Sequence, residues 1–164
     1  MFTQKFEKIK NLSEMFELVK ESVRYCLNKE RAGLMLGLAE LGGSPENFVG
    51  AFYQIGGNVI VMNKTALNNV KSIRPDLYNS YCFFILLHEY LHSLGILDES
   101  YTQSIEYMII EKVFGTDHTV TQIARNFNSI FPNIMMVSQG WQPDYEFKLE
   151  IISGFNSSNA SYIG

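Results

Sequence analysis

The sequence predicts an α+β fold in a single domain, and three observations support this. The chain has 164 residues, of which 46% are hydrophobic, so one folded unit with a sizeable core is expected. Several long stretches repeat apolar residues at the spacing of an α-helix, whereas two short β-rich runs flank a Gly-Gly pair. No repeat or linker divides residues 1–155, which we predict to form one domain, and the Ser- and Asn-rich residues 156–164 are expected to be a flexible tail.

The first half of the chain is expected to contain two helices and a β-hairpin. Ser13 can cap a helix whose apolar positions from Phe16 to Leu27 follow the helical period. Residues 31–41 are predicted to form a second helical piece that stops at a pair of glycines. The β-rich runs are residues 48–54 and 58–62, and the Gly-Gly pair between them predicts a hairpin with a small mixed or antiparallel sheet.

The chain after residue 62 is predicted to be mainly helical. A short helix is expected near residues 65–72, and a longer apolar helix from about 79 to 94. Gly95 favours a helix end and Asp98 is a natural N-cap for a helix over residues 99–114, so these two helices should fold back antiparallel. Residues 119–131 predict a further helix, and residues 145–151 alternate apolar and charged side chains as a half-buried strand does.

Composition narrows the classes of partner and compartment. The net charge of −4, with Lys and Glu interspersed, argues against a nucleic-acid partner. Cys26 and Cys82 lie in apolar helical runs and no C-x-x-C pattern occurs, so we expect free core cysteines in a reducing compartment. No apolar run reaches membrane-spanning length and the first residues lack the pattern of a secretory signal, so we expect a cytoplasmic protein without a membrane partner.

The segment His88-Glu89-Tyr90-Leu91-His92 is an H-E-x-x-H pattern within the long apolar helix. Residues four apart lie on one face of a helix, so both imidazoles can bind the same metal ion. Burying two histidines and a glutamate on an apolar helix would be costly without such an ion. The pattern therefore predicts a site for one Zn²⁺, with His88 and His92 as ligands and Glu89 as the general base that activates a water.

The stretch from His88 to Gly95, with a β-hairpin before it and a helix after it, resembles the zincin metallopeptidases. Within that family it is most similar to the small soluble archaeal minigluzincins, over about residues 50–118. The resemblance implies a zincin-like domain and a zinc-dependent metallopeptidase that hydrolyses peptide bonds of peptide or protein substrates with a metal-activated water. It also implies that the strand over residues 58–62 forms the sheet edge and pairs with an extended substrate.

The third zinc ligand has several candidates. We place His118 first, because imidazole suits zinc and the chain turns back just before it. Glu106 is an alternative, since the antiparallel helix pair brings it level with His88. Asp98 is another, because it completes the spacing H-E-x-x-H-x-x-G-x-x-D, although an N-cap role competes with metal binding. Glu99, one residue further on, has the same ambiguity, and spacing alone leaves the choice open.

A different class of function remains open beside the peptidase. The protein would then bind zinc as a regulatory or interaction protein without turnover, because the third ligand is missing or because the C-terminal tail with Tyr162 fills the cleft. An open coordination position favours the enzyme, whereas one closed by the chain favours the binding protein. A metal-free helical domain with an accidental motif would show no zinc after purification.

Overall fold

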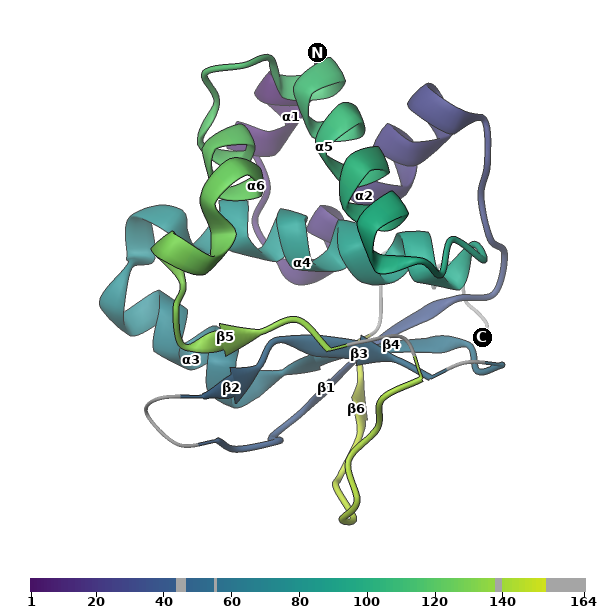
Figure 1. The fold of residues 1–164 in the computed structure, drawn as a ribbon, viewed down its shortest axis with the longest axis vertical. Coiled ribbons are helices and arrows are strands. Elements are labelled where there is room, and N and C mark those ends of the chain that lie inside the picture. Colours follow the sequence, from purple (N-terminus) through teal and green to yellow (C-terminus); the bar gives the residue numbers. More distant parts are fainter. Residues whose placement is uncertain (44–46, 55, 138–139, 153–164) are drawn as a thin grey trace.

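The computed structural model describes residues 1–43, 47–54, 56–137 and 140–152. These residues form six α-helices and a small mixed sheet (Figure 1), which confirms the predicted α+β class. The predicted tail, residues 156–164 with Tyr162, lies outside the described residues. Among the helices of the described ranges, none has the length and apolar character needed to cross a membrane.

The elements follow one another along the chain in a mixed order of helices and strands. The helices are α1 (Phe2–Glu7), α2 (Leu12–Leu27), α3 (Lys64–Ile73), α4 (Tyr78–Ser93), α5 (Glu99–Phe114) and α6 (Thr119–Ile130), with a 3₁₀ turn at Pro75–Leu77. The strands are β1 (Met35–Ala39), β2 (Phe48–Val49), β3 (Ala51–Tyr53), β4 (Val59–Asn63), β5 (Ile134–Met135) and β6 (Glu150–Ile151).

A four-stranded sheet in the order β3-β4-β1-β6 forms one layer, and α4 lies across one face of it (Figure 1). β3 and β4 are antiparallel, with Ala51 opposite Met62 and Tyr53 opposite Ile60, which confirms the predicted hairpin. β4 also pairs in parallel with β1, and β1 pairs antiparallel with β6. A separate parallel pair, β2 and β5, adjoins the N-terminal end of β3.

Strand β4 lies inside the sheet, so the expectation that residues 58–62 form the edge is wrong. Both sides of β4 are paired, with β3 on one side and β1 on the other. The edge strand nearest α4 is therefore β3. The position beside β4 is taken by β1, a strand that the sequence pattern did not predict.

Residues 31–41 form a loop and strand β1, not the predicted helix. The run contains Leu, Ala and Met, which favour helices, and this local preference led to the wrong prediction. Pairing with β4 buries Leu36 and Ala39 and outweighs that preference, because strand propensity depends mainly on packing against neighbours.

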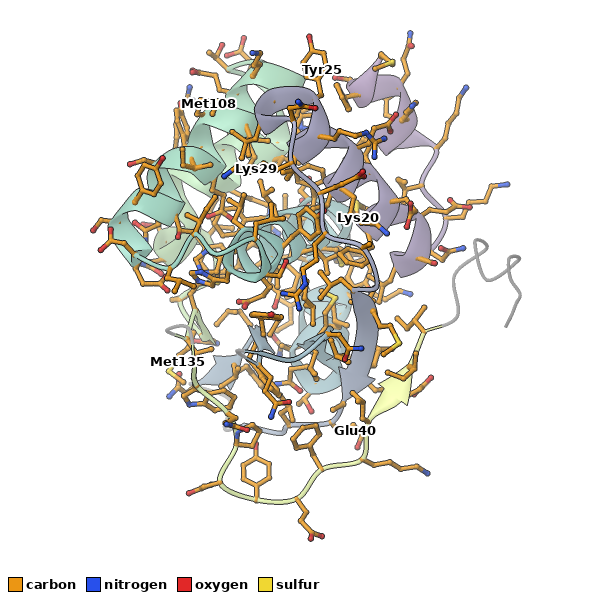
Figure 2. The ribbon with its side chains drawn as sticks, turned by 90° about the vertical axis from the view of Figure 1, so that its right-hand side faces the viewer. Lys20, Tyr25, Lys29, Glu40, Met108 and Met135 are labelled. Atoms are coloured by element: carbon orange, nitrogen blue, oxygen red, sulfur yellow. The ribbon has the colours of Figure 1, made fainter. Side chains whose placement is uncertain are left out.

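Residues 145–151 form a strand only at their end, where β6 pairs with β1. The preceding residues run beneath the sheet as a loop (Figure 2), on the side opposite the helices. There Phe147 packs edge-on against Phe52, and the Tyr145 hydroxyl donates a hydrogen bond of 2.8 Å to the Leu41 carbonyl. The alternating apolar and charged residues therefore belong mainly to a loop, and its Tyr145 and Phe147 side chains attach it to the rest of the protein.

The other predicted helices are confirmed to within two residues. α2 starts slightly earlier than expected, because Asn11 and not Ser13 caps it by accepting a hydrogen bond from the Glu14 amide. Gly95 has a φ of 93° just after α4, as its role at the helix end requires. Asp98 caps α5 through a 2.8 Å hydrogen bond from the Tyr101 amide.

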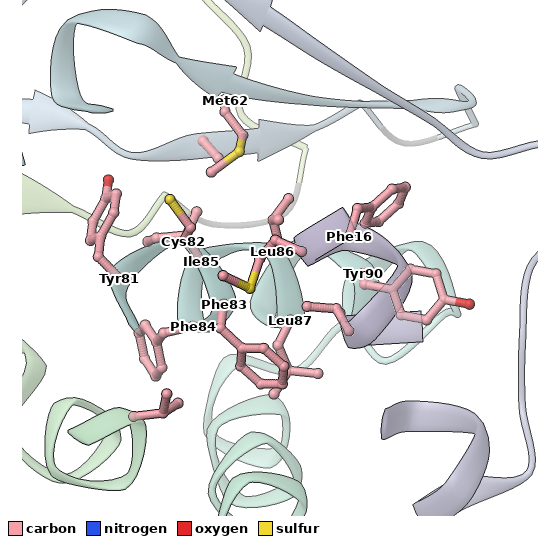
Figure 3. Packing of buried hydrophobic residues seen from close by; sticks show 14 of the residues in the cluster. Phe16, Met62, Tyr81, Cys82, Phe83, Phe84, Ile85, Leu86, Leu87 and Tyr90 are labelled. Atoms are coloured by element: carbon pink, nitrogen blue, oxygen red, sulfur yellow. The ribbon is translucent and has the colours of Figure 1, made fainter. Parts of the chain in front are cut away.

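Helix α4 is buried from Ser80 to Ser93. Figure 3 shows Cys82 on the side of Met62 in the sheet, whereas Phe83 and Leu87 point the opposite way. A helix covered on all sides exposes none of its faces to water, so the polar residues of the motif also lie in the interior. The core of the protein therefore surrounds the candidate site.

Helix α5 begins close to the C-terminal end of α4 and then rises steeply away from it (Figure 1), so it does not pack alongside α4 as the predicted antiparallel pair would. Glu99 at its start lies beside His92, and Glu106, two turns later, lies beside His88. Figure 1 shows α5 leaving α4 at an open angle, so only its first turns approach the motif.

Arg31 fixes the hairpin against the C-terminal end of α4. Its guanidinium donates hydrogen bonds to the Tyr53 hydroxyl, to the Ser93 carbonyl at 2.8 Å and to the Gly57 carbonyl at 2.6 Å. Its backbone amide donates to the Tyr90 hydroxyl at 3.1 Å. These contacts hold the edge strand β3 beside the motif.

Asn63→Ala is expected to lower the free energy of unfolding by about 2–4 kcal/mol, because it leaves several buried polar groups without partners. Asn63 is completely buried between β4 and α3. Its side chain accepts hydrogen bonds from two backbone amides and donates to two backbone carbonyls, those of Leu41, Thr65, Gly42 and Val49.

Urea unfolding followed by circular dichroism measures this change. Asn68→Ala, an exposed position on α3, is the matched control and should change stability by less than about 0.5 kcal/mol. Equal stability of the two variants would show that the Asn63 hydrogen bonds contribute nothing net.

Candidate metal centre

The two imidazoles of the motif face each other one turn apart on α4. His88 and His92 are each 1% exposed, and their Nε2 atoms are 3.1 Å apart. The helical spacing of four residues produces this approach, as the sequence predicts. Two ring nitrogens this close require either a shared proton or a cation between them.

The other nitrogen of each ring meets a hydrogen-bond acceptor. His92 Nδ1 is 2.8 Å from the Ile96 carbonyl oxygen, and His88 Nδ1 is 3.3 Å from Glu106 Oε1. A carbonyl oxygen can only accept, so Nδ1 of His92 carries a proton and its Nε2 can present a lone pair. An ionised Glu106 likewise accepts a hydrogen bond from the Nδ1–H of His88, so Nε2 of His88 also presents a lone pair. Metal-binding histidines use this arrangement, in which the second nitrogen donates to a carboxylate or carbonyl.

The carboxylate of Glu99 lies against both Nε2 atoms. Its Oε1 is 3.3 Å from His88 Nε2 and its Oε2 is 3.0 Å from His92 Nε2. Its side chain is 37% exposed, whereas the imidazoles are buried. In the part of the chain that the structure describes, these three side chains form the group whose potential metal-binding atoms converge.

The distances within this group fit a small metal ion. Ligand atoms about 2.0–2.1 Å from a tetrahedral zinc ion lie about 3.3 Å from one another. The nitrogen pair is 3.1 Å apart and the nitrogen–oxygen pairs are 3.3 and 3.0 Å apart. Two imidazoles and one carboxylate are also a donor set of catalytic zinc sites, which keep one further position for water or substrate. The residues present therefore fit the metal that the motif predicts.

The surrounding carboxyl groups favour positive charge at His88, whereas burial and the charge of His88 lower the pKa of His92. Burial by itself would lower the pKa of the His88 imidazole. The hydrogen bond to Glu106 and the negative charges of Glu106, Glu89 and Glu99 outweigh burial and raise that pKa to about 9. A site that stabilises a bound proton in this way also attracts a metal cation, which displaces the proton when it binds.

Glu89 is buried beside the pair and is only 2% exposed. Burial raises the pKa of its carboxyl to about 8, against the charge of His88 and the Tyr53 backbone, which lower it. The negative charges of Glu99 and Glu106 act in the same direction as burial. A carboxyl group with a pKa in this range can both accept and release a proton near neutral pH, as a general base must.

His118, which the sequence analysis placed first as third ligand, is not part of this group, and the carboxylate that lies beside the two imidazoles is that of Glu99. The His118 ring stacks on Phe114 with centroids 4.5 Å apart, and its Nδ1 accepts a 3.1 Å hydrogen bond from the Val120 amide. It therefore acts as the N-cap of α6. The turn after α5 returns the chain toward α1, where Phe6 also contacts the imidazole.

The two alternatives have other roles. Asp98 uses its carboxylate to cap α5, and this leaves the next residue, Glu99, to face the histidines. Glu106 is level with His88, as helix geometry predicts, but it reaches Nδ1 and not Nε2. It therefore orients the imidazole. One feature of the sequence favoured Glu99. If Asp98 caps α5, its carboxylate is already hydrogen-bonded to its own helix, and Glu99 is the adjacent carboxylate that remains for a metal.

A cleft of about 640 Å³ borders His88. It lies between α5 and α6, and residues 132–136 form part of its wall. Its lining includes apolar side chains such as Phe84 and Phe127, and polar ones such as Tyr107 and Arg125. A cleft of this size next to the histidine pair can accommodate several atoms of a ligand beyond the metal.

Glu106→Gln is expected to weaken zinc binding by about 10–100-fold, the range typical for groups that orient a metal ligand. The substitution keeps the shape of the side chain but removes the negative charge beside His88 Nδ1. Competition titration against a chromophoric zinc chelator measures the affinity. Glu30→Gln, whose side chain is 66% exposed, is the control for loss of one negative charge. An unchanged affinity in Glu106→Gln would contradict the orienting role.

Comparisons of this chain with protein-family models, with curated proteins and with solved structures give no match.

Proposed function

We propose that this protein is a zinc-dependent metallopeptidase with a zincin-like fold, in which His88, His92 and Glu99 hold the metal ion and Glu89 is the general base. The observation that carries the proposal is the convergence of two imidazole Nε2 atoms and a carboxylate beside a second, buried glutamate. The resemblance of the motif to that of the zincins agrees with it. The mixed sheet with a β-hairpin beside the motif helix supports the proposal at the level of the α+β class.

His88, His92 and Glu99 would hold the zinc ion, and when bound it would supply Lewis acidity, lowering the pKa of a water and polarising a substrate carbonyl. Glu89 accepts a proton from the attacking water while the water oxygen bonds to the carbonyl carbon. Glu89 then donates this proton to the amide nitrogen as the C–N bond breaks. The products are a carboxylic acid and an amine, which together contain the atoms of the peptide and one water. Burial of Glu89 supports this role, because its raised pKa lets the carboxyl hold the proton between the two transfers.

The edge strand β3 offers hydrogen bonds to an extended substrate. The Gly50 carbonyl accepts a hydrogen bond from the Asn63 amide at 3.0 Å, so this carbonyl and Phe52 face β4, whereas the alternate residues Ala51 and Tyr53 face outward. No further strand of the described residues pairs with β3 on that side. A peptide could therefore add to this edge next to Glu89.

Mass-spectrometric analysis of a peptide mixture incubated with the zinc-loaded protein tests the proposal. Cleavage at defined bonds is expected, with loss of activity after zinc is removed by a chelator and recovery after zinc is restored. A protein that binds one equivalent of zinc but cleaves no peptide would overturn the proposal and favour the zinc-binding protein without turnover. Absence of zinc binding would overturn the metal site itself.

A further inference from the structure

The cleft beside His88 extends toward one end of the edge strand. Along α4, Tyr81 and Ile85 lie next to Gly50, since a Cβ at Gly50 would be 3.2 Å from atoms of both. Glu89, further along the helix, lies near Tyr53. α4 and the β2–β3 segment therefore run in the same direction. Because the cleft is lined by Phe84 and His88, it extends from the metal group toward the N-terminal end of β3.

This direction determines which part of a substrate reaches the cleft. A peptide that pairs antiparallel with β3 runs, from its N-terminus to its C-terminus, from Tyr53 toward Ala51. The residues that follow the scissile bond therefore approach the cleft. The residues before that bond lie toward the hairpin turn.

The sheet edge beyond Ala51 is already occupied by the chain itself. β5 pairs with β2, with Phe48 opposite Ile134 and Val49 opposite Met135, and the Gly50 amide donates to the Met135 carbonyl at 3.1 Å. Figure 2 shows Met135 at the outer side of the molecule. A bound peptide cannot continue along the strand past this point, so its C-terminal part must end or turn into the cleft.

Arg125 on α6 lines that cleft. Its Nε donates a 2.9 Å hydrogen bond to the Tyr107 hydroxyl, and its guanidinium carbon is 5.8 Å from the centroid of the Tyr107 ring. The Lys and Arg residues that form ion pairs within the described ranges are others, namely Lys5, Lys20, Arg24, Lys64 and Arg74. Tyr107 thus holds the guanidinium while leaving its two terminal nitrogens for a ligand.

Among the described residues, Arg125 forms no ion pair with a carboxylate. Glu106, the carboxylate that lines the cleft, directs Oε1 toward His88 Nδ1 at 3.3 Å, and Glu111, outside the lining, has Oε2 3.4 Å from the Tyr107 hydroxyl. A guanidinium matches the geometry of a carboxylate and can bind it through two parallel hydrogen bonds.

We propose that Arg125 is a specificity-determining residue that binds a carboxylate on the C-terminal side of the scissile bond. This inference rests on the proposed peptidase function and names a substrate class for it. The carboxylate has two sources, the C-terminus of the peptide or an acidic side chain just after the cleaved bond. If Arg125 binds the C-terminal carboxylate of the substrate, the protein is an exopeptidase, because the cleft then holds the C-terminal end of the peptide.

Three peptides with one cleavable sequence distinguish these sources. The first has a free C-terminus, the second a C-terminal amide, and the third a C-terminal amide with Glu directly after the scissile bond. The zinc-loaded wild-type protein is expected to cleave the first or the third with a kcat/KM about 10–100-fold above that of the second, the range expected for hydrogen bonds to a charged group. Preference for the first identifies the terminal carboxylate, and preference for the third identifies the side chain. Equal cleavage of all three would overturn the inference.

Arg125→Gln should abolish the preference, mainly through a higher KM for the carboxylate peptide. Arg125→Lys, which keeps the charge but not the planar fork, should retain a part of it. Arg24→Gln removes a positive charge from α2 and is the matched control. A preference that survives in Arg125→Gln, or that is lost equally in Arg24→Gln, would overturn the assignment.

Calorimetric titration separates failure of this inference from failure of the peptidase proposal. Zinc-loaded Glu89→Gln and the double variant Glu89→Gln/Arg125→Gln are titrated with the same three peptides. Weaker binding of the carboxylate peptides to the double variant supports the Arg125 site even if the wild-type protein cleaves nothing. Equal binding by both variants overturns it.

Discussion

Glu89→Gln is expected to keep one equivalent of bound zinc and to lower kcat for peptide hydrolysis by about 10²–10⁴-fold, the range typical for loss of a general base. The amide has the size of the carboxyl group, so the buried position beside His88 and Tyr53 should remain filled. An amide cannot accept the proton of the attacking water. The chemical step is therefore lost while the metal ligands are unchanged.

Zinc content by elemental analysis and initial rates on a fluorogenic peptide measure the two properties separately. Glu30→Gln, at a position whose side chain is 66% exposed, is the control for a glutamate-to-glutamine change. A Glu89→Gln protein with the wild-type rate would remove Glu89 from the mechanism. Loss of zinc together with activity would instead mean that Glu89 holds the site together.

Glu99→Ala is expected to weaken zinc binding by about 100-fold or more, whereas His118→Ala should leave it unchanged; replacement of an orienting residue alone already costs about 10–100-fold. Glu99 is the carboxylate that lies against both imidazole Nε2 atoms. His118 is engaged as a helix cap and stacks on Phe114. Its removal should cost stability, about 1 kcal/mol for a lost cap, without affecting the metal.

The pair of variants forms a direct contrast, because each removes one of two candidate ligands. Competition with a chromophoric chelator measures the zinc affinity, and thermal unfolding shows that both variants are folded at the temperature used. Retained zinc in Glu99→Ala with loss of zinc in His118→Ala would reverse the assignment of the third ligand.

The comparison of the sequence with the structure shows where local reasoning was sufficient. The boundaries of α5 follow from Asp98 and Gly115, which lie at its two ends and act on adjacent residues. The face shared by His88 and His92 follows from helical periodicity alone. The hairpin of β3 and β4 follows from β-rich runs around glycines.

Reasoning from the local sequence failed where the structure of a segment depends on packing against a segment that is distant along the chain. β1 was predicted as part of a helix, because no residue within the run reveals that β4 will lie beside it. The same omission moved the predicted sheet edge from β3 to β4. The expectation that His118 lies beside His88 and His92 failed for a similar reason, since the direction in which the turn after α5 carries His118 depends on its packing against Phe6 and Phe114.

The sequence by itself thus determined the α+β class, the helix that holds the motif, and the pair of imidazoles with a glutamate between them. Only the tertiary structure decided that Glu99 faces both Nε2 atoms, that Glu106 faces Nδ1, and that β3 is the edge beside them. The physical reason is the range of the interactions. Helix caps and helical periodicity depend on residues a few positions apart, so they can be recognised in the sequence. Which imidazole nitrogen a glutamate of α5 contacts depends on how α5 crosses α4.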